Sequence, residues 1–504
     1  MSGLPTRIAP KREDRLRSCI AFGGTLCGAK DKISCGCMND GDREFTQGSI
    51  CLMLPGIAML NSLPDNVNLL HGAVGCGVCS HSQNANTRSG NAARFGAVKD
   101  GVWISTAMNE ADVIGGGEGK LRRAIIEADQ LYRPKTITVV ASCVPGITGD
   151  DVDGVIAGVQ PLVSARVIPI HCEGFKTKIW ATAYDAVYHG LAGTMLDDPD
   201  FGKRILEDEM EALKIEALKK NTVNLFNVSS MGKVDEDELT RLLNGLGCEV
   251  NVFPVFAEPE KMYRIKYAAL SISTCPTHDD YFLKFFEEEY GIPYILRNMP
   301  IGIENTNEWL RDAARFFRRE KIAEALISAE NEKLNAALAK YREFFKGKKV
   351  FVSAGEFRAL ATAELMAELG FEIVGIRSFH HDEFANQEYE KLQKAAGDFA
   401  FNIANCQPYE EANLLKKLKP DLFLGHWNGN ATAAKLGIPS HVIYNTGLSY
   451  IGYRGAFEIA RRLYRQLSNP VFARKLSRYA RLPYRESWYG EDPFKYIKGG
   501  EANV

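Results

Sequence analysis

The chain has 504 residues, 45% of them hydrophobic and 25% charged, a composition that supports about three globular domains and excludes an intrinsically disordered chain. Its 61 Lys and Arg residues nearly balance its 63 Asp and Glu residues, so the charge gives no reason to expect nucleic acid or an anionic membrane as a partner. Because no apolar run reaches the length of a membrane span or a signal peptide, we expect a cytoplasmic protein that works with small molecules or other proteins.

The first 50 residues are rich in Gly, Cys and charge and show no clear periodicity, so we expect an extended N-terminal arm. From about residue 135 the chain repeats one pattern, in which a short β-branched run and a turn precede an amphipathic stretch. Strands that alternate with helices are typical of parallel sheets covered by helices. The predicted strands lie within 135–143, 165–175, 221–230, 268–275, 348–355 and 420–425.

Two charged segments divide this pattern into three units. Acidic residues crowd 206–211, and 326–349 has the pattern of one long charged helix. We therefore predict an α/β protein of three Rossmann-like domains with parallel sheets flanked by helices. The expected divisions are an arm over 1–50 and domains over 51–217, 218–346 and 347–504.

Cysteine is the residue type that points most clearly to a function. In a reducing compartment, the 12 cysteines are better candidates for metal or redox ligands than for disulfides. Cys143, Cys172 and Cys275 each follow a predicted strand, at the sheet edge where α/β proteins bind ligands. Thiolates suit iron-sulfur clusters, and Gly-rich neighbours let backbone amides approach the cluster sulfides. The C-x-x-C pair at Cys76 could also be a thioredoxin-like redox site, but its flanking glycines predict a tight loop instead of a helix start.

Four segments carry a resemblance to a known family: SICLMLPG, HGAVGCGVCS, SCVPGITGDD and ISTCPTHDDY. In this order they resemble the catalytic α-subunit of nitrogenase component 1 and its homologues, and the resemblance covers most of residues 45–465. Cys51, Cys76 and Cys143, at spacings of 25 and 67 residues, match the three cysteines that hold half of the family's bridging eight-iron P-cluster. Their resemblance implies a metal-binding role for all three.

The resemblance also implies two protein partners. A β-type subunit is expected to hold the other half of the P-cluster, in an α2β2 heterotetramer. An ATP-hydrolysing iron protein dimer is expected to deliver the electrons. Because this chain has no G-x-x-x-x-G-K-[ST] phosphate loop, we expect ATP to bind only to that iron protein.

A large iron-sulfur cofactor at the active site is the next implication of the resemblance. Cys275 matches the cysteine that binds one end of this cofactor, and Gly355 and Arg358 match residues that contact it. The second ligand, a His in nitrogenase, aligns with Tyr444, while His441 lies three residues earlier. Either residue, or neither, remains possible as the second ligand.

Three residues depart from the nitrogenase pattern. Trp180 and Tyr184, which we expect on one helix face, stand where nitrogenases have a Gln and a His over the reactive face of the cofactor. Asn428 replaces the Lys that anchors homocitrate, so we expect the cofactor to lack homocitrate. The two aromatic residues would weaken proton delivery and suit an apolar methylthio group. Alternatively, both are ordinary core residues.

These departures favour a reductase similar to the methylthio-alkane reductases, which cleave carbon-sulfur bonds of small thioethers, over a nitrogenase proper. A different class of function, a scaffold for cofactor assembly, is also compatible with the stretch NTRSG at 87–91 and with the absence of homocitrate anchoring. Dark-operative tetrapyrrole reductases of the same superfamily are disfavoured because they need no cysteine at the position of Cys275.

The remaining cysteines have simpler interpretations. We interpret four as structural: Cys79, Cys172, Cys248 and Cys406. Four more in the N-terminal arm could bind a metal, although a packed or solvated arm is the simpler interpretation: Cys19, Cys27, Cys35 and Cys37.

Overall fold

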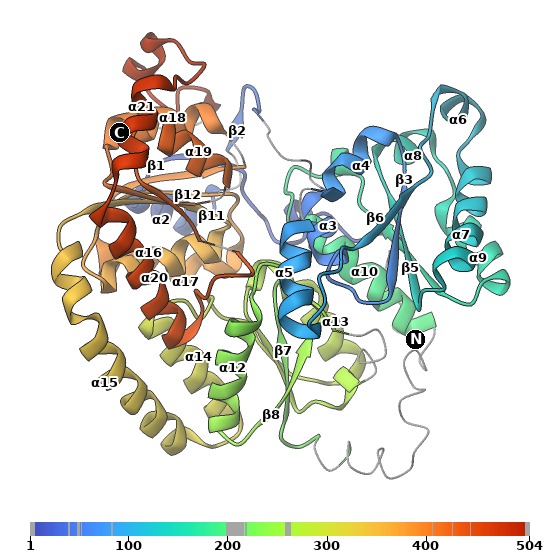
Figure 1. Cartoon of the computed structure of the whole chain (residues 1–504), viewed down its shortest axis with the longest axis horizontal. Helices are drawn as coiled ribbons and strands as arrows, with labels where there is room; N and C mark the ends of the chain where they lie inside the picture. The colour runs from blue at the N-terminus through green and yellow to red at the C-terminus, as the bar shows by residue number, and fades with distance from the viewer. Residues whose placement is uncertain are drawn as a thin grey trace.

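The computed structural model describes residues 6–38, 41–47, 51, 53–81, 84–197, 216, 219–257, 264–405, 407–425, 427–443 and 445–498. Within these residues the chain forms three α/β units, each a sheet with helices packed on it, which meet at the centre of the molecule (Figure 1). All six predicted strands are present, as β5, β6, β7, β9, β11 and β14, with the bounds given below. No helix in this described part of the chain is long and apolar enough to cross a membrane.

The first unit has a parallel sheet of order β4-β3-β5-β6. Every residue of the two central strands, β3 and β5, is buried, because helices pack on both faces of the sheet. The strands are β3 (Asn66–His71), β4 (Val102–Ser105), β5 (Thr136–Ala141) and β6 (Arg166–His171). The helices are α3 (Leu54–Leu60), α4 (Val74–His81), α5 (Asn84–Phe95), α6 (Glu110–Gly115), α7 (Glu118–Tyr132), α8 (Cys143–Thr148), α9 (Val152–Val159) and α10 (Thr182–Asp197).

The second unit has a parallel sheet of order β10-β9-β7-β8. The strands are β7 (Thr222–Phe226), β8 (Glu249–Phe253), β9 (Leu270–Ser273) and β10 (Tyr294–Ile295). The helices are α12 (Lys233–Gly245), α13 (Pro276–Tyr290), α14 (Ile303–Phe316) and α15 (Glu320–Phe345). Trp309 of α14 is fully buried, and its indole N–H donates a hydrogen bond to the carbonyl of Ser273 at 3.2 Å. This contact fixes α14 against the carboxyl end of β9.

The third unit has a six-stranded sheet of order β1-β13-β12-β11-β14-β15. Its parallel strands are β11 (Lys349–Ala354), β12 (Glu372–Ser378), β13 (Ala400–Ala404), β14 (Leu422–Gly425) and β15 (Ser440–Val442). The helices are α16 (Glu356–Glu368), α17 (Asn386–Ala396), α18 (Pro408–Leu418), α19 (Trp427–Lys435), α20 (Gly452–Ser468) and α21 (Val471–Tyr479). Helix α20 packs on α15 and α12, and the largest buried core runs through the second and third units.

The N-terminal residues differ from the predicted extended arm, because they contain regular structure that packs on the third unit. Strand β1 (Ala21–Thr25) pairs antiparallel with β13 at the edge of the sheet, and β2 (Asp42–Arg43) pairs with β16 (Ile497–Lys498). The sequence of β1, AFGGT, is too short and too rich in glycine to show strand periodicity. The remaining elements are α1 (Arg12–Arg15), α2 (Leu26–Ser34) and the 3-10 helices η2 (Gln160–Leu162), η3 (Gly174–Lys176), η6 (Glu383–Ala385) and η7 (Glu486–Gly490).

Candidate functional site

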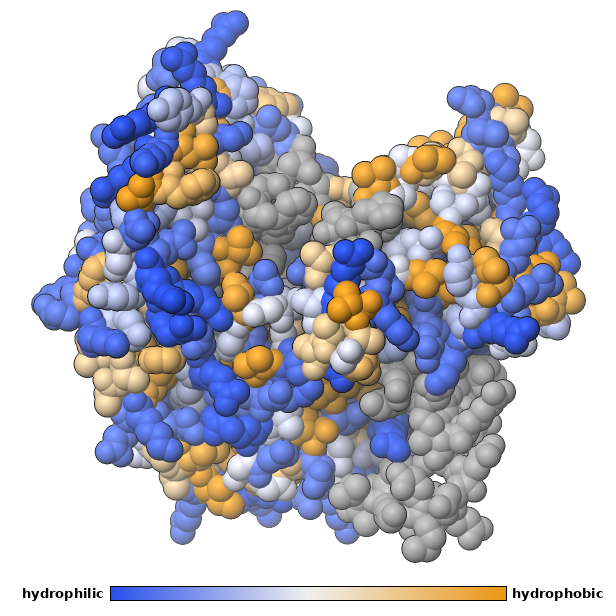
Figure 2. Space-filling view, in the orientation of Figure 1, coloured by the Kyte–Doolittle hydropathy of each residue, from blue (hydrophilic) through white to orange (hydrophobic). Residues whose placement is uncertain are grey.

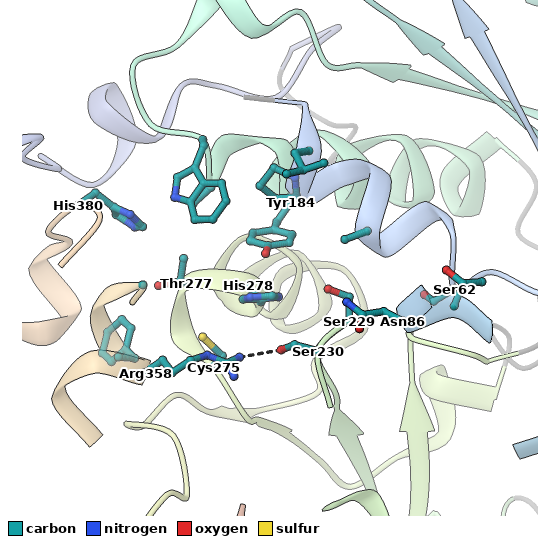
Figure 3. Close-up of a pocket in the computed structure, with 18 of the residues that line it drawn as sticks. Ser62, Asn86, Tyr184, Ser229, Ser230, Cys275, Thr277, His278, Arg358 and His380 are labelled. Carbon is teal, nitrogen blue, oxygen red and sulfur yellow. Dashed lines mark hydrogen bonds between the residues drawn. The ribbon is translucent and has the colours of Figure 1, made fainter. Parts of the chain in front are cut away.

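A cavity lies where the three units meet, beyond the carboxyl ends of β9 and β11 (Figure 3). It contains about 1080 Å³ of space that protein atoms do not fill, part of it open to solvent. The first unit contributes Trp180 and Tyr184, the second Cys275, and the third Gly355 and Arg358. The structure therefore brings together in one cavity five residues that the sequence predicts for the cofactor site.

Cys275 joins β9 to α13, and its side chain is only 5% exposed. Its backbone N–H donates a hydrogen bond to the hydroxyl oxygen of Ser273 at 2.9 Å, which fixes the turn. Burial raises the pKa of the thiol to about 12, although the charge of Arg358 opposes this shift. Such a thiol stays protonated until a cation displaces its proton, so Cys275 suits metal binding better than attack as a free nucleophile.

Asp279 of α13 holds the turn that carries Cys275. The hydroxyl of Ser273 donates to Oδ2 of Asp279 at 2.7 Å, and the hydroxyl of Tyr188 donates to Oδ1 at 3.1 Å. Burial raises the pKa of Asp279 to about 8. Sequence reasoning did not single out this residue, although the acidic pair that closely follows Cys275 in THDDY was an available signal.

Arg358 and Gly355 lie at the start of α16. The guanidinium of Arg358 donates to the hydroxyl oxygen of Ser230 at 2.8 Å and lies over the ring of Tyr450, 4.9 Å from its centroid. A Cβ added to Gly355 would meet no atom within 4 Å, so the backbone here faces open space. A bound group can therefore approach the N-terminal end of α16 closely.

Trp180 and Tyr184 both line the cavity, but the prediction that they share a helix face is wrong. Helix α10 begins at Thr182, so Trp180 lies in the turn before it. The ring of Trp180 contacts Phe379, with centroids 5.1 Å apart, and the ring of Tyr184 stacks on His278 at 3.8 Å. Before the helix, the backbone N–H of Thr182 donates to the carbonyl of Ile179 and that of Ala183 to the carbonyl of Trp180, so Trp180 belongs to a turn.

Two histidines that sequence reasoning missed also line the cavity, His278 and His380. Burial, together with the charge of Arg358, holds the pKa of His278 well below its usual range, so it is a neutral imidazole at physiological pH. His380 is 1% exposed, and its Nε2 lies 3.1 Å from Oδ2 of Asp382. The available signal was the position of the SFHHDEF segment at the carboxyl end of β12.

The three candidate P-cluster cysteines lie in or beside short helices of the first unit. Cys143 is the first residue of α8 after β5, and Cys51 precedes α3. Cys76 lies inside α4, so the predicted tight loop is wrong. Helix α4 begins shortly after β3, and a cysteine near the start of a helix that follows a strand is the arrangement expected of the thioredoxin-like redox alternative. Cys51 is exposed, and the other two are partly exposed. Among the described residues, no group of three or more His, Cys, Asp or Glu side chains converges as a metal site.

Cys172 lies near two of these cysteines, although we predicted a structural role for it. Burial and then the charges of Cys51 and Cys143 raise the pKa of its thiol above the usual range. Its sulfur would lie 3.4 Å from a Cβ on Gly56. The thiol of Cys172, just after β6, therefore lies near the edge of the sheet where Cys51 and Cys143 lie.

A hydrogen-bonded pair joins the HGAVGCGVCS and SCVPGITGDD segments. Nε2 of His71 lies 3.0 Å from Oδ2 of Asp150, and its Nδ1 lies 3.1 Å from the hydroxyl of Thr106. A Cβ on Gly72 would lie 1.9 Å from the hydroxyl oxygen of Ser142. The segments just before the helices that carry Cys76 and Cys143 therefore approach so closely that a residue larger than glycine would not fit at position 72.

Of the two sequence candidates for the second cofactor ligand, only His441 is described by the structure, and it does not line the cavity. His441 lies on β15 and is not among the lining residues; burial lowers its pKa to about 4. Tyr444 and Cys406 lie outside the described residues, and so do the side chains of Asn428 and Cys79.

The N-terminal cysteines form no metal site within the described part of the chain. Cys35 and Cys37 are paired as a disulfide, which differs from the expectation that the cysteines are not paired. Cys19 is buried, and burial raises its pKa to about 11. Cys27 accepts a hydrogen bond from Gln393 at 2.7 Å, so this thiol contacts the third unit.

Comparison with known proteins places these features in a family. A family model described as nitrogenase component 1 type oxidoreductase matches residues 51–468. The chain is 27% identical to the nitrogenase iron-molybdenum cofactor biosynthesis protein NifE of Methanococcus maripaludis, over 87% of each chain. It is 29% identical to NifE of Methanosarcina barkeri, over 88% of this chain and 93% of that protein. It is 25% identical to the nitrogenase molybdenum-iron protein alpha chain of Methanosarcina barkeri, over 81% and 84% of the two chains.

A solved structure, nitrogenase Cp1 at pH 5, matches with a TM-score of 0.68 and 21% identity over 88% of this chain and 93% of that one. This match confirms the predicted α/β fold with parallel sheets flanked by helices. Because the family model spans more than half of the sequence, the chain belongs to the nitrogenase component 1 type oxidoreductases.

Proposed function

We propose that this chain binds a large iron-sulfur cluster in the cavity through Cys275 and acts as the α-type subunit of a nitrogenase-like reductase. The observation that carries the proposal is the buried thiol of Cys275, a residue that lines a cavity formed between all three units. Thr277 and His380 line the same cavity, and the buried Oγ1 of Thr277 and Nδ1 of His380 have no hydrogen-bond partner within the described residues. Such atoms are costly to bury unless a bound group meets them.

The burial of the site favours catalysis over release of the cluster. Arg12 is fully buried and bonds Asp185 of the first unit at 3.0 Å, Asp280 of the second at 2.8 Å and Asp382 of the third at 2.9 Å. These ion pairs hold the three units together next to the cavity. A cluster inside would be fixed in orientation between the three units, as a catalytic cofactor needs to be.

The proposed substrates are small methylthio-alkanes. When bound, the cluster supplies low-potential electrons. Dimethyl sulfide that takes up two electrons and two protons gives methane and methanethiol, so the iron protein must deliver the electrons. Trp180 and Tyr184 form an aromatic wall for the substrate, and each sulfur-aromatic contact contributes about 0.3 to 1.5 kcal/mol.

We further propose that Cys51, Cys76 and Cys143 hold half of a bridging cluster at the interface with a β-type subunit. Exposed apolar side chains surround these cysteines: Val74 at 66% and Val78 at 69% on α4, and Ile147 at 73% on α8. Figure 2 shows apolar side chains on the upper part of the first unit, beside the hollow that separates it from the third. Exposed apolar surface of this kind is typical of a protein interface.

The absence of homocitrate remains part of the proposal and rests on the neutral side chain at Asn428. A fixed cation would be needed there to offset the charge of a tricarboxylate. Mass spectrometry of acid-extracted cofactor checks it, and one homocitrate per cluster would contradict it.

A second candidate function is a scaffold on which a nitrogenase-type cofactor is assembled. The comparisons favour it, because two of the relatives described above are named as iron-molybdenum cofactor biosynthesis proteins and are as similar to this chain as the alpha chain is. A scaffold would use the same cavity and Cys275, but it would have to release its cluster.

One experiment separates the two functions. The complex of this chain with its β-type subunit is assayed without oxygen, together with the iron protein, ATP, a low-potential reductant and dimethyl sulfide. The reductase proposal expects methane in the wild type and none in Cys275→Ala, whereas Cys248→Ala, which removes a buried thiol outside the cavity, should retain it. Absence of methane, with transfer of the cluster to an apo-enzyme, would establish the scaffold. Ammonia from dinitrogen without hydrocarbon would establish a nitrogenase.

A further inference from the structure

We propose that His380 is the second protein ligand of the cluster that Cys275 binds, in the role that sequence reasoning left to His441 or Tyr444. The inference rests on the proposed function, since it requires a cluster in the cavity. His380 follows β12 in the third unit, whereas Cys275 follows β9 in the second. The two ligands would therefore hold the cluster between two units.

The first argument is the environment of the His380 ring. The side chain is 1% exposed and lines the cavity at the end remote from Ser62 and Asn86 (Figure 3). Its Nδ1 is buried and has no hydrogen-bond partner within the described residues. An imidazole nitrogen in this state loses its hydration on folding and gains nothing in return unless a bound group contacts it.

The second argument is the tautomer of the ring. Nε2 of His380 lies 3.1 Å from Oδ2 of Asp382. Oδ2 of Asp382 also accepts from Nε of the fully buried Arg12 at 2.9 Å, and this ion pair identifies the group as a carboxylate. A carboxylate can only accept, and Nε2 must carry the proton of the neutral ring. Nδ1 is then left with the lone pair that a metal ligand needs, and carboxylate-histidine pairs of this kind orient metal-binding imidazoles.

The third argument is the rigidity of Asp382. Its Oδ2 accepts from Nε of Arg12 at 2.9 Å, its Oδ1 accepts from the hydroxyl of Ser18, and its backbone N–H donates to Glu356 at 2.8 Å. All of these groups are buried. A histidine hydrogen-bonded to such a fixed carboxylate has little freedom to rotate, and it can present Nδ1 to the cavity without a further entropic cost.

The competing imidazole in the cavity is His278. Its ring is stacked on Tyr184 at 3.8 Å, so one face is covered by the phenol. Among the described residues, no carboxylate is hydrogen-bonded to it in the way that Asp382 is to His380. His278 is therefore the residue whose variant tests the alternative ligand.

The test is pulsed EPR of the cluster in the complex with the β-type subunit, prepared with 14N-histidine or 15N-histidine. We expect a histidine nitrogen coupling in the wild type that changes with the label, disappears in His380→Gln and persists in His278→Gln. The matched control is His381→Gln, since His381 is the adjacent buried histidine, its Nδ1 lies 2.7 Å from Glu356, and it does not line the cavity. This control should keep the coupling.

The outcomes separate this inference from the proposed function. Absence of any histidine coupling in the labelled wild type, which requires no variant to fold, would overturn the inference, as would a coupling that survives in His380→Gln or disappears only in His278→Gln. In those cases a cluster signal that still depends on Cys275 leaves the proposed function intact. Lack of a Cys275-dependent cluster signal in the wild type would instead overturn both.

Discussion

The two groups of candidate cluster ligands differ in how much of their surroundings this chain supplies. Cys275 lines a cavity formed between all three units, with its turn fixed by Ser273 and Asp279. Cys51 is exposed, Cys76 and Cys143 are partly exposed, and the helices around them present apolar side chains to solvent. The comparison teaches that one chain can surround one candidate site with its own units and leave the other candidate site exposed at its surface.

The largest effect is expected from removal of the interior ligand. Cys275→Ala should abolish the cavity cluster, because no other thiol lines the cavity within the described residues. Iron analysis and EPR of the purified complex measure the loss. Cys248→Ala is the control, and a cavity cluster retained in Cys275→Ala would show that the two regions do not differ as proposed.

Cys76→Ala should remove only the bridging cluster. We expect the iron content to fall by the amount held at the interface while the cavity signal remains, because the first unit's cysteines and the cavity are separate regions of the fold. The unmodified chain purified without the β-type subunit should lack the same iron. An unchanged iron content in Cys76→Ala would sink the assignment of Cys76 as a ligand.

The third prediction tests whether the ion pairs of Arg12 hold the three units together beside the cavity. Arg12→Ala leaves Asp185, Asp280 and Asp382 buried without their common partner, and the loss of one partner from a buried ion pair costs about 3 to 5 kcal/mol. We expect a lower thermal unfolding midpoint and faster loss of the cavity cluster.

Arg7→Ala serves as the comparison for that variant. Arg7 also pairs with a carboxylate, Asp151, at 2.6 Å, but its side chain is 60% exposed, and exposed pairs contribute about 0 to 1 kcal/mol. Equal shifts of the unfolding midpoint in the two arginine variants would contradict the proposal that Arg12 holds the three units together.

The smallest expected effect is on the pH dependence of stability, through His171 at the end of β6 in the first unit. Burial lowers the pKa of His171, but Asp153 and Glu173 overcome this effect and raise it to about 9. Because this folded value lies above the unfolded value of about 6.5, the stabilisation is fully present below pH ~6.5 and is lost as the pH rises to about 9. His171→Gln should therefore remove about 1 to 3 kcal/mol of stability at pH 6 and little at pH 9.5.

Thermal melting of the wild type and of His171→Gln over this pH range measures the difference. Asp279, whose pKa is raised to about 8, is present in both proteins, so its titration cancels in the difference between their melting curves. A constant difference between the two melting curves at all pH values would contradict the assignment to His171.

The sequence by itself determined the fold class and the positions of the six strands that it predicted. Runs such as 136–141 and 349–354 are predicted as strands because β-branched and apolar residues fill positions that helices cover on both faces. The position of Cys275 follows from the same argument, because the carboxyl end of a parallel strand is where an α/β sheet binds ligands. These features depend on residues that are close together in the sequence, so the sequence was sufficient to predict them.

The tertiary structure alone decided which polar groups meet. Arg12 and Asp382 are 370 residues apart in the chain and 2.9 Å apart in space, so no local pattern could connect them or single out His380. Likewise β1 is a strand because it pairs with β13. His441 lies outside the cavity because β15 is the strand at the far edge of the sheet. Hydrogen bonds and ion pairs act over a few ångströms, and only the packing of the three units brings their partners within that range.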